Sequence, residues 1–365
     1  MPQLLACDAT SIKIPMTGVQ LAVREQVRAL TAALPPAVRA EVYSHIELSD
    51  GLGASAETVR TPPLLRFPAM RILWQQLKLP RILTKSCADL LYAFAYTAPL
   101  HCPIPYFLNV HDIIALERPE MCSRRNLLQM RLLLPQSIRG AARCFVSTSD
   151  GADALMHRLD IPYERIEVNP LGVDIRFFSS PAPRAHNRPY FLFVGNIEPK
   201  KALDTLLDAY SSCAESIDAD LIVVGRAAWK SSRTVARLKD WRGNGTVRWL
   251  DYVPREQLPA MYQHALALVM PSIIEGFGLP VLEAMAAGAP VIHSNHPALS
   301  EAAGSAGLSF PVGDASALSS LLQCVADSEP LRRELSEAGR AHAATRTWSR
   351  WGEQAAQAVI QFLNA

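Results

Sequence analysis

The sequence predicts an α/β protein made of two Rossmann-like, doubly wound domains. The first reason is length, because 365 residues exceed the roughly 250–300 that a single hydrophobic core usually supports. The second is the alternation of short, nearly continuous runs of Val, Ile, Leu and Phe with amphipathic stretches, which is typical of parallel strands buried on both faces. The third is a proline-rich polar segment between two such series.

Each apolar run is an expected strand, and the amphipathic stretches between them are expected helices. The strands are predicted at 3–10, 89–95, 105–112, 143–149 and 165–170, and then at 190–195, 220–225, 247–253, 265–272 and 289–295. Helical periodicity is clear at 24–34, 201–213 and 281–288.

The segment SSPAPRAHNRP, residues 179–189, is the expected linker. It divides a first domain at 1–178 from a second at 190–345, and a C-terminal helix at 346–365 could cross back to the first domain. Ligands of doubly wound folds bind beyond the carboxyl ends of the strands. We therefore expect the two domains to face a central cleft that holds the site.

Composition argues against several classes of protein. A net charge of +2 gives no indication of nucleic-acid binding. Seven dispersed cysteines without a C-x-x-C pair favour reduced thiols, and no His or carboxylate cluster has metal-ligand spacing. The N-terminal sequence does not look like a signal peptide, and no apolar run is long enough to span a membrane, so we expect a cytoplasmic protein.

Two basic runs without acids lie in the first half of the chain, at 60–85 and 124–143. The first mixes arginines and lysines with Trp74 and leucines, which is compatible with contact at an anionic membrane surface. The alternative is a helix that packs its apolar side into the domain, and for Trp74 itself this alternative is the favoured one.

The stretch PSIIEGFGLPVLEAMAAGAPVI, residues 271–292, contains the strongest functional signal. Gly276 and Gly278 permit positive φ, and Pro280 suits the first residue of a helix. A glycine turn that leads into a helix N-terminus can bind an anion such as a diphosphate. Glu275 and Glu283 on either side could each grip vicinal hydroxyls, although either acid alone could instead be a surface acid or a complement to the helix dipole.

This stretch resembles the E-x7-E signature of the retaining GT-B glycosyltransferases of family four, the glycosyl transferases group 1. Further segments occur in the family's order between about residues 70 and 315: RILWQQLKLPRIL, FLNVHDIIALERPEM, VNPLGVD, FVGNIEPKKALDTLLDAY and HPALSEAAGSAGLSFP. The tryptophan–glutamine segment and the E-P-K-K loop are similar to those of bacterial polysaccharide mannosyltransferases in particular.

The resemblance implies roles for individual residues of the second domain. Glu283 would bind the nucleotide ribose and Glu275 the donor sugar. Lys201 would neutralise the leaving diphosphate together with Lys200, because Asn196 stands where relatives often carry an arginine. The sugar and the diphosphate would meet the backbones of Gly276, Phe277, Gly278 and Leu279.

Two residues of the first domain also match the family. His111, in the H-D pair, would hydrogen-bond the donor sugar, while Asp112 is expected to cap or orient the following segment. Gly18 would let the backbone approach the diphosphate or the acceptor. The expected catalytic residues are therefore His111, Lys201 and Glu275.

The implied reaction is hexosyl transfer with retention, without a metal or a cofactor. The donor would be GDP-mannose, with a UDP-sugar as the alternative. The acceptor would be a glycan or lipid-diphosphate-saccharide of polysaccharide or lipopolysaccharide assembly, at the inner face of the plasma membrane. Two alternatives of other classes are an epimerase or phosphorylase of the same design and a non-catalytic nucleotide-sugar-binding subunit.

Overall fold

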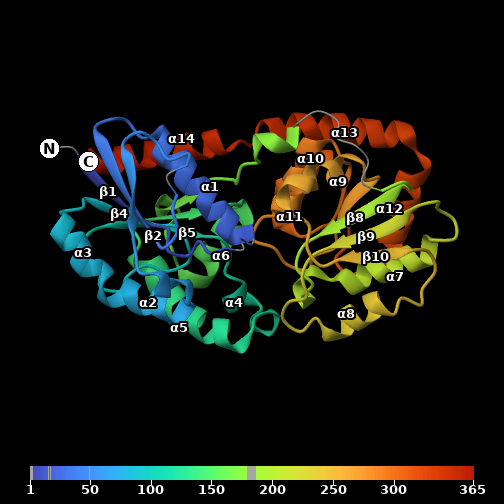
Figure 1. Ribbon diagram of the computed structural model, residues 1–365, viewed down its shortest axis with the longest axis horizontal. Coiled ribbons are helices and arrows are strands. Elements are labelled where there is room, and N and C mark those ends of the chain that lie inside the picture. The colour runs from blue at the N-terminus through green and yellow to red at the C-terminus, as the bar shows by residue number, and fades with distance from the viewer. Residues whose placement is uncertain (1–2, 15, 17, 49, 179–185) are drawn as a thin grey trace. The chain divides into compact units, whose positions relative to one another are not determined.

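The computed structural model describes residues 3–14, 16, 18–48, 50–178 and 186–365 (Figure 1). The chain forms two compact units, which are described separately. The first comprises Met1–Pro119, Arg124–Gly172 and Trp348–Ala365, and the second comprises Glu120–Ser123 and Val173–Thr347. Each unit contains one wholly parallel sheet with helices between its strands, which confirms the predicted pair of Rossmann-like domains.

The sheet of the first unit has seven strands in the order β3-β2-β1-β4-β5-β6-β7. Their bounds are β1 Gln3–Asp8, β2 Val38–Ser44, β3 Ala56–Arg60, β4 Leu90–Ala93, β5 Tyr106–Val110, β6 Arg143–Val146 and β7 Ile166–Val168. The helices are α1 Gly18–Ala33, α2 Pro68–Leu77, α3 Leu79–Ser86, α4 Ile114–Glu117, α5 Arg124–Gly140, α6 Ser149–Leu159 and α14 Trp348–Leu363.

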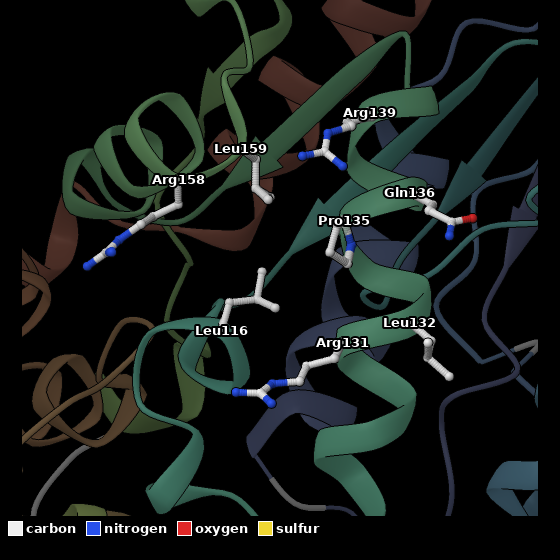
Figure 2. A pocket seen from close by; sticks show the side chains of 8 residues that line it. All are labelled: Leu116, Arg131, Leu132, Pro135, Gln136, Arg139, Arg158 and Leu159. Carbon is white, nitrogen blue, oxygen red and sulfur yellow. The ribbon is translucent and has the colours of Figure 1, made fainter.

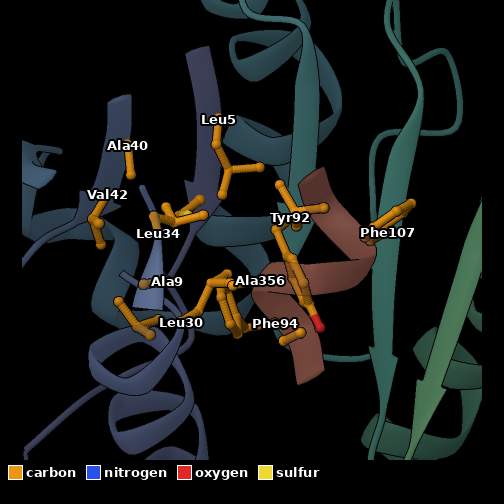
Figure 3. Packing of buried hydrophobic residues seen from close by; sticks show 14 of the residues in the cluster. Leu5, Ala9, Leu30, Leu34, Ala40, Val42, Tyr92, Phe94, Phe107 and Ala356 are labelled. Carbon is orange, nitrogen blue, oxygen red and sulfur yellow. The ribbon is translucent and has the colours of Figure 1, made fainter. Parts of the chain in front are cut away.

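The C-terminal helix α14 completes the core of the first unit. Figure 3 shows Ala356 of α14 beside Leu30 of α1 and the aromatic rings that project from β4 and β5. Trp351 and Val359 are fully buried in the same cluster. Near Gly352 the two helices approach so closely that a Cβ at this position would lie 2.2 Å from the carbonyl oxygen of Ala29.

The sheet of the second unit has six strands in the order β10-β9-β8-β11-β12-β13. Their bounds are β8 Tyr190–Val194, β9 Asp220–Val224, β10 Val247–Leu250, β11 Ala267–Met270, β12 Val291–Ser294 and β13 Leu308–Phe310. The helices are α7 Leu203–Cys213, α8 Ser232–Lys239, α9 Leu258–Gln263, α10 Leu279–Ala287, α11 Pro297–Ala303, α12 Ala315–Asp327 and α13 Glu329–Ala344. The strands that follow β8 in sequence are added on one side of it, and those that follow β11 are added on the other side. The carboxyl ends of β8 and β11 therefore form the topological switch point of this sheet.

Three strands were not anticipated from the sequence. β2 alternates buried and exposed residues over part of its length, and β3 is an edge strand with no fully buried residue. Neither forms the continuous apolar run that marks a strand buried on both faces. β13 lies at the edge of the six-stranded sheet and is only three residues long, which is too short for an apolar run to be recognised in the sequence.

The boundary between the two units lies at a different place in the sequence from the one expected. The second unit begins at Val173, ahead of residue 178, because the Val173 N–H donates to the carbonyl of Arg346 at 2.9 Å within that unit. The predicted linker falls mostly outside the described residues, since 179–185 are not described. All seven cysteines are free, and no helix in the described part of the chain is long and apolar enough to cross a membrane.

Replacing Gly352 by alanine tests the docking of α14. The new methyl group would press on the backbone of Ala29, which cannot yield as a flexible side chain does. We expect the free energy of unfolding in urea to fall by roughly 1–3 kcal/mol. Gln357→Ala, on the exposed face of the same helix, should change stability little; equal stability of the two variants would contradict the close approach.

Candidate functional site

The site in the second unit forms where the loops after β8 and β11 meet at the switch point. The loop after β8 contains a 3-10 turn, η5 Pro199–Lys201, and the loop after β11 leads into α10. The Ile273 N–H donates to the carbonyl of Lys200 at 2.8 Å, which joins the two loops through the backbone. Lys201 Nζ and Glu275 Oε1 then form an ion pair at 2.5 Å.

The glycine turn before α10 has the conformation that an anion site needs. Gly278 has φ +114°, and a Cβ there would lie 2.7 Å from Leu299 Cδ2, so both backbone and space require glycine. Gly276, for which positive φ was also expected, is not among the described glycines with positive φ. Helix α10 begins at Leu279, so Pro280 is its second residue and not its first.

The backbone amides of this turn are available to a ligand. Within the described part of the chain, the N–H groups of residues 276–279 have no hydrogen-bond acceptor. The helix dipole adds a partial positive charge at the same place. Unpaired amides at a helix N-terminus are suited to an anion, and the predicted diphosphate role of this turn stays a prediction.

Glu275 is held as an anion beside this turn. Its side chain is 9% exposed, and Oε1 also accepts a hydrogen bond from the Ser272 hydroxyl at 2.7 Å. Burial by itself raises the pKa of Glu275, but the charges of Lys201 and Lys200 and the hydrogen bonds from Lys201 and Ser272 outweigh it, so the pKa falls below its ordinary value.

The two adjacent lysines have different partners. Lys201 is 13% exposed and faces Glu275, whereas Lys200 Nζ lies 3.5 Å from Glu198 Oε1. The following residue, Ala202, has φ +46°, a left-handed conformation that is unusual for alanine and turns the chain into α7. Asn196, on the same loop, is exposed.

The neighbouring loop after β9 supports the loop that contains the lysines. The Ile197 N–H donates to the carbonyl of Arg226 at 2.9 Å, and the Ala228 N–H returns a bond to Ile197 at 3.0 Å. A Cβ on Gly225 would lie 1.8 Å from the carbonyl oxygen of Gly195, so this approach requires glycine. The segment 225–230 thus supports the loop after β8 from one side.

Glu283 lies inside α10 and is 4% exposed. Its Oε1 pairs with Arg255 Nη2 at 2.8 Å, and its Oε2 accepts a hydrogen bond from the Tyr262 hydroxyl at 3.1 Å. Burial raises the pKa of Glu283, and Arg255 and Tyr262 offset this only in part, so the pKa stays above its ordinary value. The pKa values of the two glutamates of the signature are thus shifted in opposite directions, although each glutamate has a cationic partner.

The partners of Glu283 were not identified from the sequence. Arg255 begins the turn η6 Arg255–Gln257, and its guanidinium lies 5.0 Å from the ring centroid of Phe177. Phe177 belongs to η4 Ile175–Phe178, which packs against α9 and α10. No local pattern around Arg255 shows that its side chain would point at α10.

His111 lies in the first unit, directly after β5, and its Nε2 donates to the carbonyl of Phe94 at 2.8 Å. This bond places the proton on Nε2 and leaves Nδ1 as an acceptor. Burial lowers the pKa of His111 further than Phe94 and Asp112 raise it, so the ring is neutral near pH 7. Asp112 accepts the Ile114 N–H at 3.1 Å and the Tyr96 hydroxyl at 2.7 Å, so it orients the start of α4, while Ile113 occupies the N-cap position.

Gly18 and the tryptophan–glutamine segment are the remaining parts of the first unit that the sequence analysis singled out. Gly18 is the exposed first residue of α1, with open space where a Cβ would be, and Thr17 before it lies outside the described residues. Trp74 packs against the core with its ring 6.2 Å from Tyr43, which confirms the packing interpretation. The adjacent Gln75 is buried and donates to Asp8 Oδ2 at 2.7 Å, so this motif is structural.

The structure therefore brings together Lys200, Lys201, Glu275, the turn 276–279 and Glu283 in the second unit, while Gly18 and His111 belong to the first. Among the described residues, no three His, Cys, Asp or Glu side chains lie close enough together to hold a metal ion.

Comparison with known proteins identifies the second unit. Residues 174–342 match the family model for glycosyl transferases group 1. The chain contains a glycosyl transferases group 1 domain. The group 1 domain begins at η4 and ends within α13, so it holds both glutamates and both lysines of the site.

Curated relatives include polysaccharide mannosyltransferases. O-antigen chain mannosyltransferase B of Escherichia coli is 32% identical over 252 residues, which are 65% of this chain and 65% of that protein. O-antigen chain mannosyltransferase RfbU of Salmonella typhimurium is 29% identical over 205 residues, 55% of this chain and 56% of that protein. The chain thus matches less than two thirds of the length of these relatives.

Solved structures match the whole chain in fold. Sucrose-phosphate synthase from Thermosynechococcus elongatus has a TM-score of 0.78 at 20% identity, covering 99% of both chains. Anabaena HepE in complex with UDP-glucose has a TM-score of 0.73 at 19% identity, covering 98% of this chain and 99% of that one. The two Rossmann-like units and these neighbours confirm the expected GT-B fold.

Breaking the Arg255–Glu283 pair should destabilise the second unit. Arg255→Met leaves the Glu283 carboxylate buried without its cation, and we expect the free energy of unfolding near neutral pH to fall by about 3 kcal/mol. Arg255→Met/Glu283→Met, which removes both charges, should recover most of this loss. Chemical denaturation of the three proteins measures it.

The pH dependence provides a second readout. The pKa of Glu283 is raised above 4.5 in the folded protein, so protonation favours the folded state and this contribution is lost as the pH rises. Without Arg255 the pKa of Glu283 rises further. The free energy of unfolding of Arg255→Met should therefore be closer to that of the wild type near pH 5 than near pH 8. A constant difference across this range would contradict the assignment.

Proposed function

We propose that the protein is a retaining hexosyltransferase that moves mannose from GDP-mannose to a hydroxyl of a glycan or lipid-linked saccharide. The observation that carries this proposal is the buried Lys201–Glu275 pair beside a turn of unpartnered amides at the switch point. The mannosyltransferases among the curated relatives support the sugar, and the group 1 domain supports the reaction class.

The diphosphate of the donor binds at the N-terminus of α10. The amides of residues 276–279 donate to its oxygens, and Lys201 supplies a full positive charge. Lys200 adds the second cation on the same loop, in place of the arginine that Asn196 replaces. We propose that these groups bear the developing charge of the leaving diphosphate without a metal or a cofactor.

Glu275 and Glu283 hold hydroxyls on either side of this diphosphate. Each oxygen of Glu283 already accepts one hydrogen bond, and the second lone pair of each stays available for the ribose hydroxyls. Glu275 uses Oε1 for Lys201 and Ser272, which leaves Oε2 for the sugar. Nδ1 of His111, an acceptor in the neutral ring, receives a further hydroxyl of the sugar.

The reaction proceeds by front-face attack with retention. The bond between the anomeric carbon and the diphosphate oxygen breaks, and the acceptor oxygen bonds to the same face of the carbon. The proton of the acceptor hydroxyl passes to the departing diphosphate oxygen. The protein contributes position and charge stabilisation, not a covalent nucleophile. Gly18 lets the backbone of the first unit approach the diphosphate or the acceptor.

A UDP-sugar donor is the second candidate, because solved neighbours include complexes with UDP and UDP-glucose. A thermal-shift panel of GDP, UDP and dTDP with their sugars separates the two. The correct nucleotide at about a hundredfold excess over its Kd should add about 2.7 kcal/mol of stability. Release of free GDP from GDP-mannose with acceptor present tests the activity, and tight binding without turnover of any donor would instead indicate a non-catalytic sugar-nucleotide-binding subunit.

Separate substitutions of the two glutamates should have different effects. Glu283→Ala should weaken binding of the bare nucleoside diphosphate, because the ribose loses its acceptor. Glu275→Ala should abolish transfer while nucleotide affinity is kept or increases, since Lys201 loses its internal carboxylate. Calorimetry with nucleotide and single-turnover transfer assays measure the two effects, and equal loss of nucleotide affinity in both variants would contradict these roles.

We also propose a peripheral contact of the first unit with an anionic membrane, as the acceptor requires if it is lipid-linked. Lys78, between α2 and α3, and Arg81, in the first turn of α3, are exposed, and so are Leu73 and Leu77 on α2. Basic side chains next to exposed leucines suit the boundary between headgroups and acyl chains.

A further inference from the structure

Tyr96 has a backbone conformation that large side chains rarely adopt. It follows β4 with φ +60°, in the left-handed region. Cys87 and Asp160 share this conformation, but they occupy the C-cap positions of α3 and α6, where a left-handed residue is common. Tyr96 lies between a strand and a loop. A conformation of this kind costs energy and persists only where the surrounding contacts hold it, and such residues cluster at functional sites.

The chain directly after Tyr96 is held by the two glutamines of the tryptophan–glutamine segment. The side-chain amide of Gln75 donates to the Thr97 carbonyl at 2.9 Å, and the Thr97 hydroxyl donates to Gln75 Oε1 at 2.8 Å. Gln76 bonds to the backbone of segment 98–100 through both its amide nitrogen and its amide oxygen. These bonds keep the chain in the turn that Tyr96 begins.

The segment around Tyr96 contacts the H-D pair after β5 at three points. The carbonyl of Phe94 accepts the Nε2 proton of His111 at 2.8 Å. The ring of Tyr96 lies edge-on to the ring of His111, with centroids 5.4 Å apart and planes inclined by 62°. The Tyr96 hydroxyl donates to Asp112 Oδ2 at 2.7 Å. Because the Tyr96 N–H also donates to the carbonyl of Asn109 at 3.0 Å, its backbone is anchored to the strand that leads into His111.

The tyrosine hydroxyl determines what Asp112 can offer to the imidazole beside it. Asp112 accepts from Tyr96 at Oδ2 and from the Ile114 N–H at Oδ1, so both carboxylate oxygens are engaged. Burial lowers the pKa of His111, and among the described residues the charge that opposes this effect is Asp112. An Oδ2 released by Tyr96 would favour a proton on Nδ1 of His111, and Nδ1 would then be a donor and no longer an acceptor.

Asp112 also orients α4, which has little support on one side. This helix has four residues and borders a hollow of about 430 Å³, where Leu116 faces Pro135 of α5 and Leu159 of α6 (Figure 2). The hollow leaves this side of α4 without close packing. The position of its first turn therefore depends on Asp112, which Tyr96 holds in place.

We propose that Tyr96 is a positioning residue of the transferase, which holds the imidazole of His111 with Nδ1 as a hydrogen-bond acceptor. Its hydroxyl engages Asp112, and its ring fixes the plane of the imidazole. Glycine would adopt this backbone without strain, but it lacks the side chain that makes both contacts. The proposal rests on the proposed contact between His111 and the donor sugar, and Tyr96 acts through His111 and not on the reacting atoms.

Tyr96→Phe tests this role, because it keeps the ring that packs against the core and removes only the hydroxyl. Tyr106→Phe is the matched control, since the Tyr106 hydroxyl donates to the Ser137 carbonyl at 2.8 Å elsewhere in the same unit. The assay is single-turnover GDP release from GDP-mannose, with water as the acceptor. Tyr96→Phe should lower this rate on the order of tenfold. Its affinity for GDP should stay that of the wild type, because GDP lacks the sugar. Tyr106→Phe should leave both unchanged, and an equal fall in the two variants, or none in Tyr96→Phe, would overturn the proposal.

NMR of the His111 ring nitrogens tests the positioning without turnover, with His111→Gln to assign the signals. Near pH 7 the wild type and Tyr106→Phe should carry the proton on Nε2 and none on Nδ1. In Tyr96→Phe a proton should appear on Nδ1 at a higher pH than in the wild type, and unchanged His111 signals would contradict the proposal. If the wild type releases no GDP while these signals change as expected, the proposed donor fails and the positioning role stands. Urea unfolding confirms that each variant is folded.

Discussion

The ion pair between Lys201 and Glu275 is the interaction on which the proposed donor site depends. A charge this deeply buried is stable only with a partner, because each ion has lost most of its hydration. The pair joins the loops after β8 and β11, and the backbone bond from Ile273 to Lys200 holds the same two loops at a second point. The backbone bond positions the glycine turn, and the ion pair fixes the Lys201 side chain beside the turn's free amides.

The two glutamates of the signature differ because their surroundings differ. Glu275 has two lysines and a serine hydroxyl, and its pKa falls. Glu283 has one arginine and one tyrosine in a fully enclosed position inside α10, with Asp174 acting against it, and its pKa rises. Identical side chains eight residues apart therefore have different chemistry: one is a firmly ionised group beside the proposed reacting sugar, and the other is a rigid acceptor fixed by Arg255 and Tyr262.

The sequence alone predicted those strands and site loops that leave a pattern in consecutive residues. Continuous apolar runs predicted ten of the strands, and the glycine turn, the lysine loop and the H-D pair were all found by motif. Strands β2 and β3 were missed because their partly polar residues suit positions near a sheet edge. Arg255, Tyr262 and Phe177 were missed for another reason. Arg255 and Tyr262 reach Glu283, and Phe177 reaches Arg255, only through tertiary packing, and their spacing in the chain gives no sign of it.

The Lys201–Glu275 pair also reduces the free energy that is lost to desolvation and side-chain ordering when the proposed diphosphate binds. Lys201 is already largely desolvated and held in one orientation, so a ligand need not strip its water or order its side chain. The amides of residues 276–279 add donors that Glu275 does not use. In the proposed donor complex Lys201 lies between Glu275 Oε1 and the diphosphate, so neither buried charge loses its partner, and Glu275 Oε2 receives the sugar hydroxyl. One lysine would thereby link binding of the anion to recognition of the sugar.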